Sequence, residues 1–248
     1  MTPDQATREL AACLERLRWT FSGYRAGGIL DWKHAHQEIP EEAPVEPRGD
    51  EPAGPGESVE HQPPDRDARL SEIARTLEGC KRCRLHSGRN NLVFGEGSAR
   101  SGLVFVGEGP GFEEDQQARP FVGRAGKLLD RMIEALGFKR NEVYICNVVK
   151  CRPPENRTPQ PDEIEACSPF LLRQIEALGP KVICALGACA SQTLIGKATS
   201  ISQLRSKVHL WRGIPLVCTY HPAYLLRTPS QKAAAWQDLK DVLKILGS

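Results

Sequence analysis

The sequence predicts an α/β fold, a three-layer α/β/α sandwich around a central, mainly parallel sheet of four strands. The main observation is a regular alternation of short apolar runs with longer amphipathic stretches from about residue 68 onward. A second observation is that the loops joining these runs are short. Alternation of this kind places parallel strands side by side and leaves helices to cover both faces of the sheet.

Composition and charge narrow the class of protein. The chain has 248 residues, of which 40% are hydrophobic and 26% charged, as in soluble globular proteins. No apolar run is long enough to cross a membrane, and the N-terminus lacks the basic-then-apolar pattern of a secretory signal. We therefore expect a cytoplasmic protein without a membrane partner. Residues 1–69 carry a net charge of −6 and residues 70–248 one of +8, which suits an anionic partner for the C-terminal part.

The chain is predicted to have an N-terminal extension ahead of its folded domain. Residues 1–37 form a helical extension, because positions 4–21 have an apolar face at helical spacing. This helix is either a docking element for an unidentified protein or a weakly ordered appendage. Residues 38–67 form an acidic linker, with seven prolines and nine acids between positions 38 and 65. Such a composition predicts disorder, and the folded domain is expected over residues 68–248.

Each element of this domain has a local signal. Compact apolar runs predict strands at 102–107, 143–149 and 181–187, and a turn into a last core strand within 208–222. Amphipathic stretches bounded by glycine, proline or serine predict helices at 68–80 (ending at Gly79), 123–137, 161–179, 188–196 and 230–246.

Three loops follow the carboxyl ends of predicted strands: residues 107–123, 147–161 and 221–230. Such loops meet at one edge of a parallel sheet, which predicts an active site there. The first loop is rich in glycine, but Phe112 stands where a dinucleotide fingerprint needs its third glycine, and no Gly-Lys-Ser/Thr follows. Its four acids would repel phosphate. The glycines suit either close approach to a flat group or a tight structural turn with solvated acids.

The other two loops offer polar side chains directly after a strand. The amide of Asn147 presents a donor beside an acceptor, which matches one edge of a nucleobase, although asparagine also forms turns and caps. His221 follows the last strand, where a histidine can be structural or catalytic. Arg227 and Ser230 lie just before a predicted helix, where they suit a contact with phosphate.

Four of the nine cysteines have the spacing of metal ligands. Cys80 and Cys83 form a C-x2-C pair, and Cys151 and Cys167 bracket the loop after the second strand. This spacing leaves zinc and an iron–sulfur cluster equally open. A chain without an export signal does not favour disulfides, and core packing suits most of the other cysteines: Cys13, Cys146, Cys184, Cys189 and Cys218.

Taken together, these motifs resemble one family. From about residue 70 to the end, the chain is similar to the family 4 uracil-DNA glycosylases, the iron–sulfur type. The resemblance rests on four cysteines at the family's spacing and on the segments "GEGPGFEED", "RPFVGRAGKLL", "NVVKCRPPENRTP" and "HPAYLLR". It implies the fold of that family and hydrolysis of the bond between uracil and deoxyribose in DNA, leaving an abasic site for base excision repair.

The resemblance also implies a cofactor. Cys80, Cys83, Cys151 and Cys167 match the ligands of a [4Fe–4S] cluster, which decides between the two metals left open above. The family's cluster is regarded as structural, holding loops near the DNA rather than taking part in the reaction.

The resemblance further implies a uracil pocket. Asn147 matches the residue that reads uracil, and Phe121 matches the ring that stacks on the extruded base. Gly109 belongs to the glycine turn, whose backbone N–H groups would approach the base. Glu114 lies where the family contacts the pocket entrance, and we expect it to exclude the 5-methyl group of thymine.

Two residues are the expected catalytic groups. His221 matches the imidazole that faces uracil O2, and Glu108 matches the acid near the sugar and the attacking water. The segment that runs from His221 to Arg227 resembles the loop that enters the DNA helix when the base leaves it. Together with Ser230, Arg227 is the expected DNA contact.

The chain departs from the family pattern at two places, and two alternative functions stay open. Ala118 stands where the family has glycine, and the extension is additional to the compact members. A branch that traps uracil covalently carries an inserted "KRRIH" segment, which this chain lacks, so we expect turnover rather than a covalent complex. We also expect the enzyme to be a monomer. The alternatives are an iron–sulfur protein that binds uracil-containing DNA without cleaving it and a redox protein. A redox protein does not explain the three loops.

Overall fold

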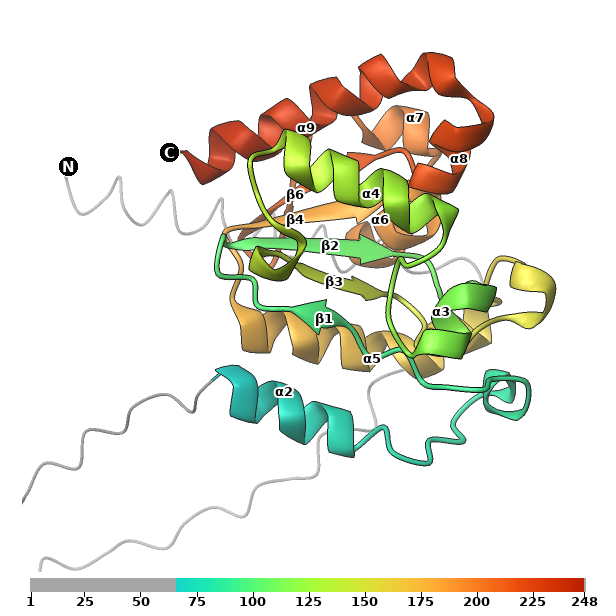
Figure 1. Cartoon of the computed structure of the whole chain (residues 1–248). Coiled ribbons are helices and arrows are strands. Elements are labelled where there is room, and N and C mark those ends of the chain that lie inside the picture. The colour runs from blue at the N-terminus through green and yellow to red at the C-terminus, as the bar shows by residue number, and fades with distance from the viewer. Residues whose placement is uncertain (1–65, 248) are drawn as a thin grey trace, which may run out of the picture. The chain divides into compact units, whose positions relative to one another are not determined.

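The computed structural model describes residues 66–247 (Figure 1). The predicted extension 1–37 and most of the linker 38–67 lie outside this range. The described part begins with α2 (Arg66–Arg75), so the last two residues of the predicted linker are helical. Residues 76–79, expected to continue this helix, form a turn instead.

The sheet has six strands rather than the predicted four, in the order β1-β3-β2-β4-β6-β5. The four parallel strands at its centre are the predicted ones. They are β2 (Leu103–Gly107), β3 (Tyr144–Asn147), β4 (Val182–Leu186) and β6 (Ile214–Thr219). Pairing is parallel throughout this set, with Gly107 opposite Asn147 in β2 and β3. The prediction of a mainly parallel α/β sheet is confirmed.

The two additional strands lie at the edges and are antiparallel. β1 (Glu96–Gly97) pairs with β3, and β5 (Val208–Trp211) pairs with β6. β1 has two residues and no apolar pattern, so the sequence gives no strand signal. β5 is largely exposed, with Leu210 72% accessible, and Arg212 and Gly213 join it to β6 with positive φ angles of 47° and 83°. Two such residues form the tight hairpin turn that suits the twist of paired strands.

Helices cover both faces of the sheet (Figure 1). Side chains alternate along each strand, so Val104 and Val106 enter one hydrophobic core while Leu103 and Phe105 enter the other. The first core contains side chains of α2, α5 (Pro161–Leu178), α6 (Gly187–Ile195) and α7 (Ile201–Leu204). The second core contains side chains of α4 (Arg124–Ala135), α8 (Pro222–Arg227) and α9 (Lys232–Leu246). This is the predicted three-layer sandwich.

Short helices within the connecting loops were not predicted. α3 (Phe112–Gln117) lies in the first loop, α7 follows α6, and α8 occupies most of the third loop. Four 3₁₀ helices complete the described chain: Arg84–Ser87, Arg140–Glu142, Pro154–Asn156 and Pro229–Gln231. Helices of four to six residues are too short to produce a clear amphipathic period. Among residues 66–247, no helix has the length and apolar character required to traverse a membrane.

Candidate active site

The three predicted loops meet at the carboxyl edge of the sheet around a cavity of about 400 Å³. Backbone hydrogen bonds join the first two loops, from Val148 N to Gly107 O (2.9 Å) and from Val149 N to Glu108 O (3.1 Å). The cavity is lined by each predicted pocket and catalytic residue: Glu108, Gly109, Glu114, Phe121, Asn147 and His221. Their convergence follows from the parallel order of β2, β3, β4 and β6.

Asn147 is the last residue of β3, and its side chain is buried at 1% exposure. Within residues 66–247, its Oδ1 is the one buried side-chain oxygen or nitrogen without a hydrogen-bond partner. An unpaired buried acceptor costs about 1–3 kcal/mol. An atom kept in that state at a cavity wall is suited to accept a hydrogen bond from a bound molecule.

Phe121 lies beside Asn147 because two glycines leave room for it. A Cβ on Gly107 would lie 2.4 Å from Asn147 Oδ1 and 2.5 Å from Phe121 Cζ, and one on Gly126 would lie 1.9 Å from Phe121 O. Phe121 itself has a φ of +51°, a conformation that is costly for residues other than glycine. Its ring centre is 5.6 Å from that of His221. Close packing therefore fixes an aromatic face and an amide at one wall of the cavity.

We expect Gly107→Ala to lower kcat/KM on the enzyme's substrate by about 100-fold, because misplacement of a positioned group by about 1 Å has that effect. The added methyl would have to displace both Asn147 and Phe121. Single-turnover kinetics of the variant measure this effect. Gly88→Ala is the matched control, since a Cβ there meets no atom within 4 Å. Equal activity of the two variants would contradict the close packing.

His221 precedes α8, and its Nδ1 accepts a hydrogen bond from Ala223 N at 3.1 Å. A ring nitrogen that accepts carries no proton, so in the neutral imidazole the proton is on Nε2. Burial, and next the nearby positive charge of Arg227, lower the pKa of His221 to about 4. The cavity therefore contains a neutral histidine at pH 7 with an Nε2–H donor.

Glu108 follows β2 directly and lines the cavity. Burial raises the pKa of its carboxyl group, while a hydrogen bond from the side chain of Thr158 opposes that shift. Thr158 also lines the cavity, as does Arg157 beside it. Sequence reasoning missed both residues, because "NRTP" resembles an ordinary loop. The Arg-Thr pair between prolines was the available signal.

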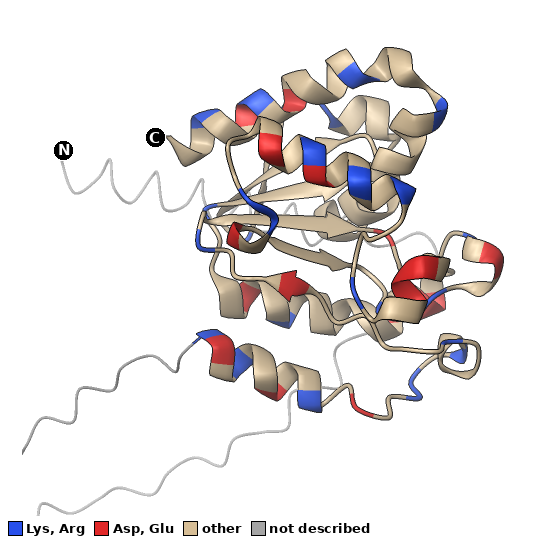
Figure 2. Cartoon of the chain, in the orientation of Figure 1, with Lys and Arg blue, Asp and Glu red and all other residues tan. Residues whose placement is uncertain are grey.

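Two of the three remaining acids of the first loop have structural contacts, whereas Glu113 is exposed. Glu114 accepts three backbone hydrogen bonds, from Gly111 (3.1 Å), Val122 (2.8 Å) and Gly123 (2.9 Å). Asp115 is fully buried and accepts from the backbone N–H groups of Asn90 and Asn91. Both acids lie in the first turn of α3 (red in Figure 2), where the helix dipole favours negative charge. The alternative of solvated acids therefore does not hold for these two residues.

Comparisons with known proteins agree with this geometry. The sequence model of the "Uracil DNA glycosylase superfamily" matches residues 94–240. A type-4 uracil-DNA glycosylase of Thermotoga maritima is 49% identical over 169 residues, 67% of this chain and 88% of the relative. Type-4 enzymes of Archaeoglobus fulgidus and Sulfurisphaera tokodaii are 41% and 44% identical and cover 72% and 71% of the chain, with 94% and 84% of their own lengths matched.

This chain belongs to the type-4 uracil-DNA glycosylase family. The resemblance drawn from the sequence motifs is thereby confirmed, and the matched region includes the three loops around the cavity. The two residues expected to contact DNA differ in their position relative to the cavity. Arg227 is exposed and lines the cavity, whereas Ser230 is exposed in the following 3₁₀ helix and does not line the cavity.

The four predicted ligand cysteines of this family member lie at the wall of one small cavity. This second cavity is lined by Cys80, Cys83, Cys151 and Cys167. Cys151 Sγ accepts from Arg89 Nη1 at 3.1 Å, and Cys167 Sγ accepts from Lys150 N at 3.3 Å. Such donors favour the thiolate form that binds metals, but burial outweighs them and raises the pKa of both thiols. In the part of the chain described, no group of three or more His, Cys, Asp or Glu side chains is placed to hold a metal ion. The donor set, four cysteines with N–H groups beside two of them, fits a [4Fe–4S] cluster.

Other cysteines pack in the core as predicted. Cys146, Cys184 and Cys218 are buried in strands, and Cys189 is buried in α6. Cys13 lies outside the described residues.

Ala118, the departure from the family pattern, ends α3 with a φ of +55°. An L-residue in this left-handed conformation costs about 1–2 kcal/mol, which glycine avoids. We therefore expect Ala118→Gly to raise the free energy of unfolding by about 1 kcal/mol, measured by urea denaturation. Ala135→Gly, at an exposed position in α4, should lower it by up to about 1 kcal/mol. Destabilisation by both substitutions would contradict strain at Ala118.

Proposed function

We propose that this chain is a uracil-DNA glycosylase, which extrudes uracil from DNA and hydrolyses its N-glycosidic bond to leave an abasic site. The unpaired Oδ1 of Asn147 at the wall of a cavity shared with Glu108 and His221 carries this proposal. In the same proposal the enzyme acts as a monomer on DNA in the cytoplasm.

Recognition begins with extrusion of the base. Flipping costs about a few kcal/mol, and stacking on Phe121 would offset about 1–3 kcal/mol of this. Asn147 would accept from uracil N3–H and donate to O4. Cytosine reverses both polarities and would leave buried groups unpaired, which discriminates strongly. Glu114, held by its three backbone hydrogen bonds, would block the 5-methyl group of thymine at the cavity entrance.

Bond cleavage separates two charges. As the N-glycosidic bond breaks, uracil leaves as an anion and the sugar develops positive charge. The Nε2–H of neutral His221 would donate to uracil O2, joined by N–H groups of the glycine turn around Gly109. The Glu108 carboxylate would stabilise the sugar cation and hold the attacking water. Arg227 and Ser230 would contact DNA phosphates beside the site.

In this proposal Cys80, Cys83, Cys151 and Cys167 hold a [4Fe–4S] cluster. The bound group would supply a structural cross-link between segments near the DNA, with no part in the hydrolysis. We expect purified protein to be brown, with visible absorption and bound iron. Cys80→Ser with Cys83→Ser should remove the colour and lower the melting temperature, while Cys13→Ser should change neither. Colourless protein that contains zinc would contradict the iron assignment.

The deciding experiment incubates the protein with an oligonucleotide that contains one uracil and then treats the product with alkali. Strand scission at uracil, and none in matched thymine or cytosine oligonucleotides, is the expected result. Binding of the uracil oligonucleotide without scission would instead support a non-cleaving damage-binding protein. That alternative leaves the positions of Glu108 and His221 unexplained.

A further inference from the structure

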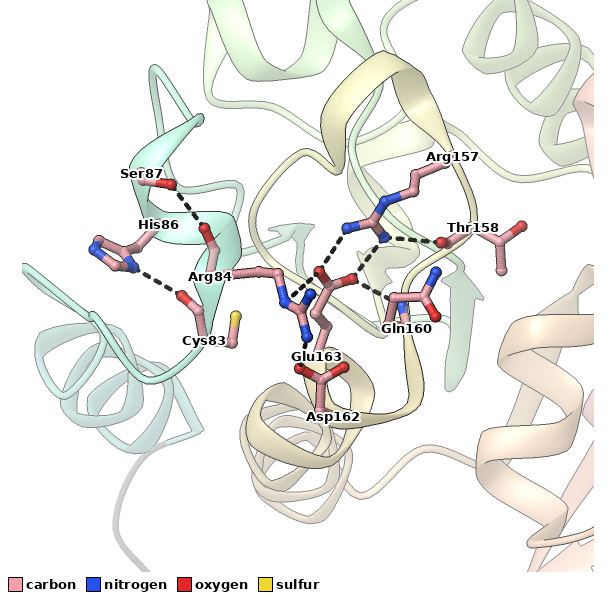
Figure 3. A network of polar contacts seen from close by, with 9 residues as sticks. All are labelled: Cys83, Arg84, His86, Ser87, Arg157, Thr158, Gln160, Asp162 and Glu163. Atoms are coloured by element: carbon pink, nitrogen blue, oxygen red, sulfur yellow. Dashed lines mark hydrogen bonds and ion pairs between the residues drawn. The ribbon is translucent and has the colours of Figure 1, made fainter.

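Glu163 is a fully buried carboxylate on the first turn of α5 (Figure 3). Its two oxygens accept from Arg157 Nη1 at 2.8 Å and Nη2 at 2.7 Å, which is a two-point ion pair. It also accepts from the backbone N–H of Gln160 at 2.8 Å. Capping of the helix requires this last bond alone, so the ion pair of this buried carboxylate with the half-buried Arg157 needs a separate explanation.

On one side this ion pair reaches the active site. Arg157 Nη1 donates a further hydrogen bond to Thr158 O at 3.0 Å. Arg157 and Thr158 line the 400 Å³ cavity together with Glu108, and the Thr158 side chain opposes the rise in the pKa of Glu108 that burial causes. Glu163 therefore fixes the backbone that presents the Thr158 hydroxyl to the proposed catalytic acid.

On the other side Glu163 reaches the segments that carry the cysteines. Arg84, which follows Cys83, has its Nε 3.7 Å from Glu163 Oε1 and donates to Asp162 Oδ2 at 2.6 Å (Figure 3). Cys167 lies four residues after Glu163, one helical turn away on the same face of α5, and both are buried. One carboxylate thus lies between the active-site loop and two cysteine-bearing segments.

This ion pair adds little net stability, because the burial of the Glu163 carboxylate costs desolvation and the partial exposure of Arg157 screens the attraction of the charges. The ion pair instead contributes a fixed position for the Arg157 side chain, through two hydrogen bonds to one carboxylate. We propose that Glu163 is a positioning residue, which holds Arg157 and Thr158 at the cavity so that Thr158 orients Glu108, and which ties this loop to the Cys83 and Cys167 segments. This inference rests on the proposed glycosylase function.

A double-mutant cycle tests this role under single-turnover conditions. Glu163→Gln keeps the side-chain size and removes the two-point ion pair, and Thr158→Val removes the hydroxyl. Each is expected to lower kcat by about 10- to 100-fold, with a smaller change in KM. The double variant should be no slower than the slower single variant, because both act through Glu108. Glu165→Gln, at an exposed position on the same helix, should match the wild type.

Arg157→Lys is a second test of the positioning role, because lysine keeps the positive charge but cannot make the two-point contact with Glu163. It should lower kcat as Glu163→Gln does, with bound iron unchanged in both. Additive losses in the cycle, wild-type kcat in either variant, or loss of activity in proportion to loss of iron would each overturn the positioning role. Failure of the wild type to excise uracil would instead overturn the proposed function, so the two failures are distinguishable.

Discussion

Asn147→Ala should lower kcat/KM for uracil excision by about 10³- to 10⁴-fold, the largest effect expected of a single substitution in this chain. A site built to hydrogen-bond one base loses discrimination and transition-state stabilisation together when its paired donor and acceptor are removed. Single-turnover excision from a uracil oligonucleotide measures the loss.

The same substitution should not weaken the fold in proportion. It removes a buried acceptor that has no partner within residues 66–247, which offsets part of the cost of the smaller side chain. We expect the free energy of unfolding to change by no more than about 1–2 kcal/mol. Retention of full activity, or loss of activity only through unfolding, would contradict the assignment of Asn147 as the uracil reader.

Glu108→Gln should lower kcat by about 10²- to 10³-fold, because it removes the carboxylate that we propose stabilises the sugar cation and holds water. The pH dependence provides a second measurement. Burial raises the pKa of Glu108 above its ordinary value of 4.5, so wild-type activity should fall as the pH drops through this raised value. Glu108→Gln should abolish this fall in activity at low pH.

His221 should not cause this fall in activity at low pH, because its pKa is lowered to about 4 and the ring stays neutral as Glu108 becomes protonated.

The raised pKa of Glu108 also makes the free energy of unfolding depend on pH. A carboxyl group whose pKa is raised on folding favours the folded state below its unfolded pKa, and this contribution is lost as the pH rises. Glu108→Gln should therefore raise the free energy of unfolding at pH 7. A Glu108→Gln variant with wild-type kcat and an unchanged fall in activity at low pH would contradict the proposed role of Glu108.

The elements of the fold were largely predictable because their signals are local. Apolar runs such as Leu103–Val106 produce strands buried on both faces, and glycines such as Gly179 end helices in the left-handed conformation. The edge strand β1 was not predictable, since Glu96 and Gly97 become a strand only by pairing with β3. Exposed or very short strands have no periodicity to read.

The sequence by itself determined which residues converge: Asn147, Glu108 and His221 each follow a parallel strand, and strand order brings them to one edge. Tertiary structure alone decided the hydrogen bonding and protonation of the residues at this edge. The unpaired oxygen of Asn147, the Nε2–H form of His221 and the three hydrogen bonds of Glu114 depend on atoms brought together from distant segments. The physical reason is that hydrogen-bond partners and burial, which set protonation and orientation, are properties of three-dimensional packing and leave no periodic trace along the chain.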